Sequence, residues 1–168
     1  MEALAKLKPA FKKGGVTTGA NSSQLTDGAA CVLLMRRSLA EKEGIPIIGR
    51  FCAYATAGVP PEIMGVGPAY AIPACLKKAG MKIEDVDIWE INEAFASQAK
   101  YCVDVLGIDH AKVNVKGGAI ALGHPLAATG ARMVATLLPE LKRTGKKVGV
   151  VSMCIGTGMG ACAVIVSE

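Results

Sequence analysis

The sequence has few aromatic residues, few histidines and no closely spaced pair of cysteines. Aromatic residues make up 4% of the 168 positions, and there are two histidines. Six cysteines are scattered along the chain without a Cys-x-x-Cys motif, so a zinc site or a redox-active pair lacks the spacing it needs. We therefore expect no bound metal, and thiols that stay reduced in an intracellular protein.

Targeting signals are also missing. Residues 1–9 lack the apolar run of a secretory signal, and the last three residues are not a peroxisomal Ser-Lys-Leu signal. The stretch 148–166 carries no charge and is long enough to cross a membrane, but glycines at positions 156, 158 and 160 interrupt it. Because this spacing suits a turn between two strands, we expect no membrane span.

The overall composition is typical of a globular protein. Hydrophobic residues make up 51% of the chain and charged residues 20%, with a formal net charge of +5 and twenty glycines. This composition supports one domain or slightly more, with many tight turns. The charge suits an anionic partner, although solubility alone could explain it, and we expect no nucleic-acid partner.

Residues 1–45 are interpreted as the end of a first domain. Residues 14–23 are small, polar and glycine-rich and predict a loop. The apolar run Gly28–Met35 predicts a strand buried on both faces, and Ser38–Glu43 predicts a short helix that ends at Gly44.

Residues 46–168 alternate strands and helices in a β-α-β-α-β-α-β-β order, which predicts an α/β domain with a mixed five-stranded sheet between helices. Three strand–helix pairs predict a mostly parallel sheet, and the short last connection predicts an antiparallel final pair. The expected strands are 47–56, 86–91, 113–115, 148–152 and 161–166, and the expected helices are 68–79, 93–106 and 125–143.

Three segments place polar groups at predicted strand or helix ends. Asn92 and Glu93 follow a strand, where ligands of open α/β sheets collect, or they serve only to cap the next helix. His124 ends a glycine-rich segment before a helix and could act as a neutral base or as a cap. His110 lies in a predicted loop and is interpreted as solvated.

The third segment, 152–160, puts Cys154 at a strand end beside a glycine turn. Bare backbone N–H groups in such a turn can serve an oxyanion, and thiolate chemistry with His124 as partner is conceivable. The alternative is a tight hairpin with a buried cysteine. Cys75 and Cys102 fall on apolar helix faces and are interpreted as core residues.

Together these segments resemble the C-terminal signatures of the thiolases, in order and in spacing. The matching motifs are Asn92-Glu93-Ala94-Phe95, the segment Gly117–Pro125, and Cys154-Ile155-Gly156-Thr157-Gly158-Met159-Gly160. Residues 21–30 resemble the end of the family's N-terminal domain, and residues 4–13 are similar to peroxisomal 3-ketoacyl-CoA thiolases. The resemblance covers essentially the whole chain.

The resemblance implies thiolytic cleavage of a 3-ketoacyl-CoA to acetyl-CoA and a shortened acyl-CoA, with CoA as a substrate and no cofactor. It implies that His124 deprotonates a nucleophile and, with a water held by Asn92, forms an oxyanion hole. Cys154 becomes an acid/base, and the Gly156 N–H joins a second oxyanion hole. Ser23 is placed at the pantetheine tunnel and Phe95 beside the acyl group.

The chain departs from the family in lacking the Cys-Ser-Ser-Gly-like motif that carries the acylated cysteine. We therefore expect a C-terminal part of a thiolase that is inactive alone and that needs an N-terminal half, encoded separately or upstream. The alternatives are a non-catalytic binding or dimerising module, and a decarboxylating condensing enzyme, against which Cys154 argues. The resemblance also implies a homodimer in the peroxisome, with the mitochondrion or cytoplasm as alternatives.

Overall fold

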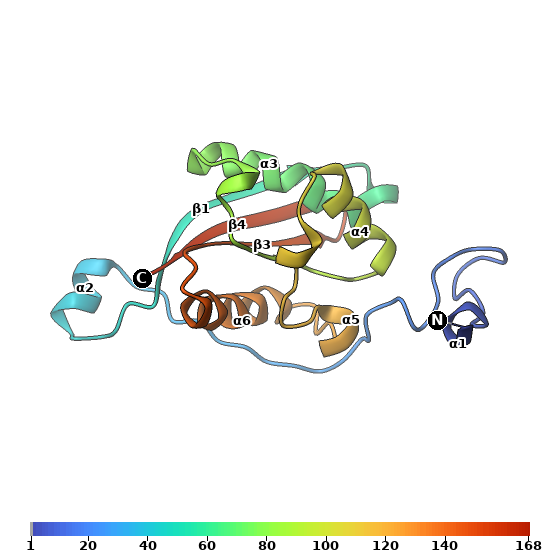
Figure 1. The fold of residues 1–168 in the computed structure, drawn as a ribbon, viewed down its shortest axis with the longest axis horizontal. Coiled ribbons are helices and arrows are strands. Elements are labelled where there is room, and N and C mark those ends of the chain that lie inside the picture. Colours follow the sequence, from blue (N-terminus) through green and yellow to red (C-terminus); the bar gives the residue numbers. More distant parts are fainter. Residues whose placement is uncertain (1) are drawn as a thin grey trace.

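A computed structural model describes residues 2–168, which form a twisted sheet with helices on both faces (Figure 1). The strands are β1 (Gly49–Gly58), β2 (Ile88–Ile91), β3 (Val148–Ile155) and β4 (Met159–Ser167). The α-helices are α1 (Glu2–Ala5), α2 (Arg37–Lys42), α3 (Gly67–Ala79), α4 (Ala96–Val105), α5 (Ala119–Leu122) and α6 (Thr129–Thr144). Single-turn or short 3₁₀ helices span Pro61–Val66, Ile83–Asp85 and His110–Lys112.

The sheet is mixed, as the sequence predicts, but only one of its three strand pairs is parallel, so the expectation of a mostly parallel sheet is wrong. Its strand order is β1-β4-β3-β2, with β2 and β3 parallel and β4 antiparallel to both of its neighbours. Three strands therefore share one direction, and β4 lies between β1 and β3 with the opposite one. The final pair is antiparallel because its connection, residues 156–158, is too short for a crossover.

The predicted fifth strand, 113–115, is wrong as a strand. In the described residues it is reduced to a single parallel bridge between Val113 and Trp89. The backbone of Asn114 has a φ of 47°, which turns the chain out of the extended region after one pair. The sheet therefore has four strands rather than five in the part of the chain that the structure describes.

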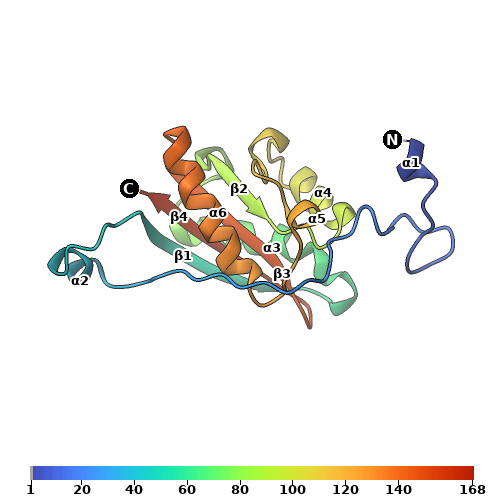
Figure 2. The same cartoon turned by 90° about the horizontal axis from the view of Figure 1, so that it is seen from below.

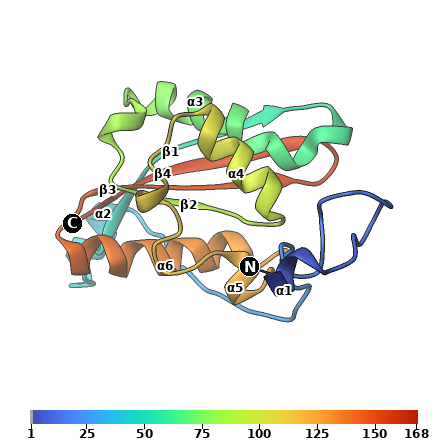
Figure 3. The ribbon, with the colours of Figure 1, turned by 45° about the vertical axis from the view of Figure 1, so that its right-hand side comes forward.

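Helices α3 and α4 cover one face of the sheet, and α6 covers the other (Figures 1 and 3). One core joins Ile72 and Leu76 of α3 to Trp89 of β2, and the second joins Met133 and Leu137 of α6 to the opposite face. Helix α3 approaches β4 so closely that a Cβ on Gly160 would lie 2.1 Å from the Gly67 carbonyl oxygen. Because both faces are covered, all four residues of β2 are buried, including the polar residue Glu90.

The predicted strand at 28–35 is also wrong. This segment forms no strand, and Leu33 and Leu34 are 73% and 70% exposed. It runs past α6 toward α2, which confirms the short helix predicted there (Figure 2). An apolar run indicates a preference for burial, but a strand also needs a neighbour to pair with, and none lies beside it in residues 2–168.

Two predicted helices begin later than the sequence suggests. Residues 93–95 are drawn into pairing with residues 21–23, through a Ser22–Phe95 bridge and a 2.9 Å bond from the Ala96 N–H to Asn21 O, so α4 starts at Ala96. Helix α6 starts at Thr129 because residues 125–128 form a turn, closed by a bond from the Ala128 N–H to Pro125 O. The uncharged stretch 148–166 is β3 and β4, and no helix of residues 2–168 is long and apolar enough to span a membrane.

Candidate active site

Asn92 and Cys154 lie at the same edge of the sheet. Strands β2 and β3 are parallel, with Ile91 beside Ser152, and the Asn92 N–H donates to the Ser152 carbonyl at 2.9 Å. Cys154 is two residues beyond Ser152 on β3. Carboxyl ends of parallel strands meet at one edge, where open α/β folds place their ligand sites.

Asn92 reaches His124 across this edge. Its side-chain nitrogen Nδ2 lies 3.3 Å from His124 Nε2. The side chain is 1% exposed, and its Oδ1 is buried without a hydrogen-bond partner. The helix cap considered for Asn92 is thus wrong, since Phe95 holds the N-cap position of α4. A buried, unpaired carbonyl beside an imidazole is a place where a water or a substrate atom can bind.

His124 is held through its ring and through its backbone. Nδ1 lies 2.7 Å from the hydroxyl oxygen of Thr129, which is fully buried, and the His124 backbone N–H donates to Gln24 O at 2.9 Å. Burial lowers the pKa of His124 below its ordinary value, and the positive charge of Arg132 lowers it further. The ring is therefore neutral at neutral pH. His124 is not a helix cap, because Ala128 is the N-cap residue of α6.

Cys154 and Gly156 stand at the turn between β3 and β4. Burial raises the pKa of the Cys154 thiol above its ordinary value, so the group is protonated at neutral pH. Gly156 is exposed, and within residues 2–168 its N–H makes no hydrogen bond outside the β3–β4 ladder. The structure gives no direct hydrogen bond between Cys154 and His124. Cys154 lies at the carboxyl end of β3, and His124 reaches the carboxyl end of the neighbouring β2 through its contact with Asn92.

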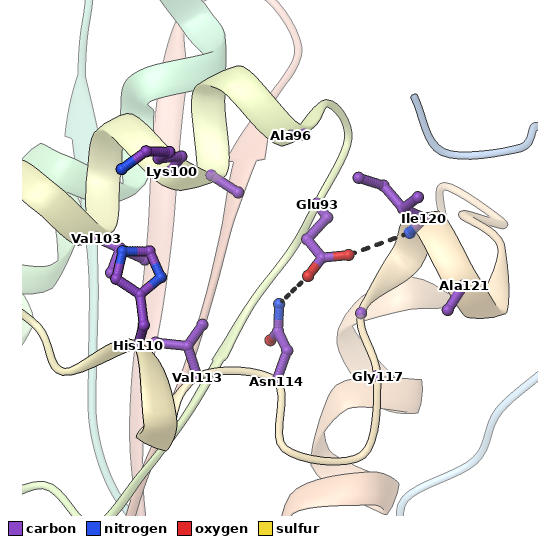
Figure 4. Close-up of a pocket in the computed structure, with 12 residues that line it drawn as sticks. Glu93, Ala96, Lys100, Val103, His110, Val113, Asn114, Gly117, Ile120 and Ala121 are labelled. Carbon is purple, nitrogen blue, oxygen red and sulfur yellow. Dashed lines mark hydrogen bonds between the residues drawn. The ribbon is translucent and has the colours of Figure 1, made fainter. Parts of the chain in front are cut away.

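Glu93 and Asn114 line a pocket of about 440 Å³ beside this edge (Figure 4). Asn114 Nδ2 donates to Glu93 Oε1 at 2.8 Å, and the Ile120 N–H donates to Glu93 Oε2 at 3.3 Å. A Cβ on Gly118 would lie 2.1 Å from the carboxyl carbon of Glu93, so a larger residue here must displace that carboxylate from its two hydrogen bonds. Glu93 thus serves the start of α5, and not that of α4 as the cap interpretation proposed. His110 is exposed and pairs with Asp104, as expected of a solvated histidine.

Ser23 and Phe95 lie next to each other through the pairing of residues 21–23 with 94–96. The Ser23 hydroxyl donates to the Ala94 carbonyl at 2.9 Å, so it already has a backbone partner. Phe95 is half-buried and meets Phe11 edge to face, with ring centroids 5.8 Å apart. Phe95 is three residues after Asn92 in the chain, and Ser23 reaches the same segment through its bond to Ala94, but nothing in the structure tests their expected contacts with substrate.

A buried ion pair that the sequence did not suggest lies beneath the site. Arg132 of α6 donates to the Glu90 carboxylate of β2 at 2.9 Å, and Glu90 is 1% exposed. Burial raises the pKa of Glu90 to about 7, although Arg132 opposes the rise. Thr129, Arg132 and Asn114 were missed because only the tertiary contacts, and no local pattern, mark them. In residues 2–168 no group of three His, Cys, Asp or Glu side chains could hold a metal ion.

Family models match nearly the whole chain. The model for "Thiolase, C-terminal domain" covers residues 45–167, and that for "Thiolase, N-terminal domain" covers residues 1–38. The peroxisomal 3-ketoacyl-CoA thiolase B of Rattus norvegicus is 70% identical over 98% of this chain. The peroxisomal enzyme of Homo sapiens is 68% identical over the same share. The chain spans 39% of the length of each of these relatives.

Solved structures share this fold over 99% of the chain. The dimeric peroxisomal thiolase of Saccharomyces cerevisiae gives a TM-score of 0.95 at 60% identity, and the Bacillus anthracis acetyl-CoA acetyltransferase gives 0.97 at 46%. Human mitochondrial 3-ketoacyl-CoA thiolase in complex with CoA gives 0.93 at 43%. This chain covers 42% of each of these structures. With both family models matched and the fold shared along its length, the chain belongs to the thiolase family.

Proposed function

We propose that this chain supplies the acid/base half of a 3-ketoacyl-CoA thiolase site. In the reaction a thiol attacks the 3-keto carbonyl, the bond between the α- and β-carbons breaks, and acetyl-CoA leaves as its α-carbon takes a proton. CoA then gives its thiol proton to the Cys154 thiolate and attacks the acyl-enzyme, and the enzyme cysteine leaves with the proton held on His124 as the shortened acyl-CoA is released. The observation that carries this proposal is the Asn92–His124 pair at the edge of the sheet that also bears Cys154.

The two titratable groups suit opposite roles. His124, with its lowered pKa, is neutral and accepts the proton of the attacking thiol. Cys154, with its raised pKa, is a thiol and donates a proton to the α-carbon of the departing acetyl group. A base and an acid whose pKa values are moved apart by their surroundings are what a reaction with a transient carbanion needs.

Two oxygens become negative during the reaction and need donors. The imidazolium formed on His124, together with a water bound to the unpaired Oδ1 of Asn92, serves one of them. The N–H of Gly156, an exposed residue of the turn between β3 and β4, serves the other. Ser23 and Phe95 are proposed to border the pantetheine chain and the acyl group.

The acylated cysteine is proposed to come from sequence outside these 168 residues, because no Cys-Ser-Ser-Gly-like motif occurs among them. The remaining N-terminal sequence of a thiolase, in the same or a separate chain, is then the first partner. A homodimer and a peroxisomal location are proposed by likeness to relatives described as dimeric and peroxisomal. Acyl-CoA and CoA are the proposed substrates.

A chimera tests this function. Residues 1–168 replace the matching C-terminal portion of the Saccharomyces cerevisiae peroxisomal thiolase, and thiolysis of acetoacetyl-CoA is followed. The proposal predicts turnover in the chimera and a loss of at least about 100-fold in kcat in His124→Ala and in Cys154→Ala. His110→Ala, which changes the other histidine, is the matched control and retains activity. A folded chimera without turnover, or one indifferent to both site substitutions, favours the non-catalytic module instead.

A further inference from the structure

We propose that Asn114 is a positioning residue: with Glu93, it sets the placement of Asn92 relative to His124. Strand β2 is the outermost strand on one side of the sheet, and its last residue, Ile91, directly precedes Asn92. An edge strand has free backbone groups along one side, and its end can shift unless something occupies them.

The Asn114 side chain occupies those groups. Its Oδ1 accepts from the Ile91 N–H at 2.9 Å, and its Nδ2 donates to the Ile91 carbonyl at 2.8 Å. Its backbone N–H donates to Trp89 O at 2.7 Å. The side chain thus continues the bridge begun at Val113, at the point where the positive φ of Asn114 ends the fifth strand. An asparagine fits here for two reasons: it tolerates this backbone conformation, and its amide carries both a donor and an acceptor.

The second hydrogen of the same amide binds Glu93, the residue that follows Asn92 in the chain. Nδ2 donates to Glu93 Oε1, and the other carboxylate oxygen accepts from the Ile120 N–H at the start of α5 (Figure 4). Asn92 is therefore flanked by two residues that Asn114 binds. Every hydrogen-bonding position of the Asn114 amide except one acceptor lone pair is used.

The Glu93 contact connects this arrangement to His124. Ile120 belongs to α5, which ends at Leu122, two residues before His124. Asn114, Glu93 and Ile120 thus join the segment that carries Asn92 to the segment that carries His124. The Asn92–His124 contact spans 3.3 Å, and a small displacement of either segment breaks it. Asn114 contacts neither of those side chains in the hydrogen bonds of the structure, so it acts through the backbone.

The experiment uses the full chain with His110→Asn as background, which leaves His124 as the only imidazole. NMR follows the pH titration of that ring in the background protein, in Asn114→Gly and in Asn114→Asp. Asn114→Gly removes the side chain and relieves the positive φ, whereas Asn114→Asp keeps the acceptor, loses both donors and faces Glu93 with a like charge. The Asn92 amide that faces Nε2 as a donor favours the neutral ring, so its displacement is expected to raise the His124 pKa by about half a unit or more.

Circular dichroism establishes that each variant is folded. Folded variants in which His124 titrates as in the background protein overturn the proposal. If neither Asn114 variant folds, Glu93→Gln decides the matter, because glutamine still accepts from Asn114 but offers one acceptor oxygen in place of two; an unchanged titration in Glu93→Gln then overturns it.

The consequence for catalysis rests on the proposed function. In the chimera, Asn114→Gly is expected to lower kcat by about 10- to 100-fold with KM little changed, because a misplaced catalytic group affects the reaction more than substrate binding. The titration requires no turnover, so the two proposals fail separately. A chimera without thiolysis rejects the function alone, and an unchanged titration rejects the role of Asn114 alone.

Discussion

The Nδ1 atom of His124 and the hydroxyl oxygen of Thr129 are 2.7 Å apart, and Thr129 is fully buried at the first residue of α6. On the other side of the ring, Nε2 faces the amide nitrogen of Asn92, which can only donate. With the Asn92 amide in this orientation, Nε2 is the acceptor, and the single proton of the neutral ring lies on Nδ1 and points to Thr129. This is the tautomer that a base acting through Nε2 requires.

The first prediction removes that hydroxyl. Thr129→Val leaves Nδ1 without its partner, so we expect a mixture of the two neutral tautomers and a loss of stability of about 1–2 kcal/mol. Thr129→Ser retains a hydroxyl and restores the single tautomer. ¹⁵N NMR of labelled histidine distinguishes a protonated from a bare ring nitrogen. A Thr129→Val protein with the wild-type tautomer pattern would contradict the assignment, as would a wild-type protein protonated on Nε2.

The second prediction concerns the buried Glu90. Its folded-state pKa, about 7, lies above the ordinary value of 4.5, so the folded protein holds the proton more tightly than the unfolded chain. The contribution of Glu90 to stability is therefore fully present below pH 4.5 and lost as the pH rises through about 7, by an upper limit of about 3 kcal/mol. Urea denaturation at intervals between pH 4.5 and 8 measures it.

Glu90→Gln is the matched variant, because it keeps the shape and an acceptor for Arg132 while removing the titration. His124 has a lowered pKa and contributes a pH slope of opposite sign, which is why the difference between wild type and Glu90→Gln is the quantity to use. We expect the wild type to lose stability relative to Glu90→Gln as the pH rises. Parallel curves for the two proteins are the result that this account does not allow.

The third prediction compares two glycines of the site. Gly118→Ala places a methyl group 2.1 Å from the carboxyl carbon of Glu93 and displaces it, whereas Gly156→Ala meets no atom within 4 Å. We expect Gly118→Ala to destabilise the fold by about 1–3 kcal/mol and Gly156→Ala by less than about 0.5 kcal/mol. Thermal unfolding of both variants measures the difference, and equal melting temperatures refute the packing argument.

The fourth prediction concerns the apolar side chains that residues 2–168 leave uncovered. Phe11, Leu25 and Leu33 are more than 70% exposed, and residues 31–35 form an apolar groove with α6. Exposed apolar area of this kind favours association. Light scattering over a range of concentrations is expected to show oligomers that grow with concentration. A monodisperse monomer at high concentration contradicts the expectation.

The sequence predicts the individual helices and strands of this chain better than it predicts which elements pack or pair with one another. Helix α3 and its end at Gly80, the antiparallel final pair and the edge that carries Asn92 follow from spacing and glycine placement alone. The exposed state of Leu33 and the four-stranded sheet do not, because both depend on whether a segment finds a strand to pair with.

The site residues also differ in whether the sequence predicts them. Asn92, His124 and Cys154 belong to sequence motifs, so they can be identified as candidates from the sequence alone. Thr129 acts through one hydrogen bond across 5 residues of chain, Asn114 acts through side-chain hydrogen bonds across 21 to 23 residues, and Glu90 is a polar residue in a fully buried strand. No periodicity encodes such contacts, so only the fold reveals them.

The most direct test of the central claim separates the two half-reactions in the chimera. Protein labelling by radioactive acetyl-CoA reports attack by the nucleophilic thiol, and acetoacetyl-CoA thiolysis reports the complete cycle. With His124 as the base for the nucleophile and Cys154 as the proton donor to carbon, Cys154→Ala is predicted to retain labelling while thiolysis falls by at least about 100-fold. His124→Ala is predicted to lose both. Labelling that survives in His124→Ala, or thiolysis that survives in Cys154→Ala, would contradict the roles assigned to this chain.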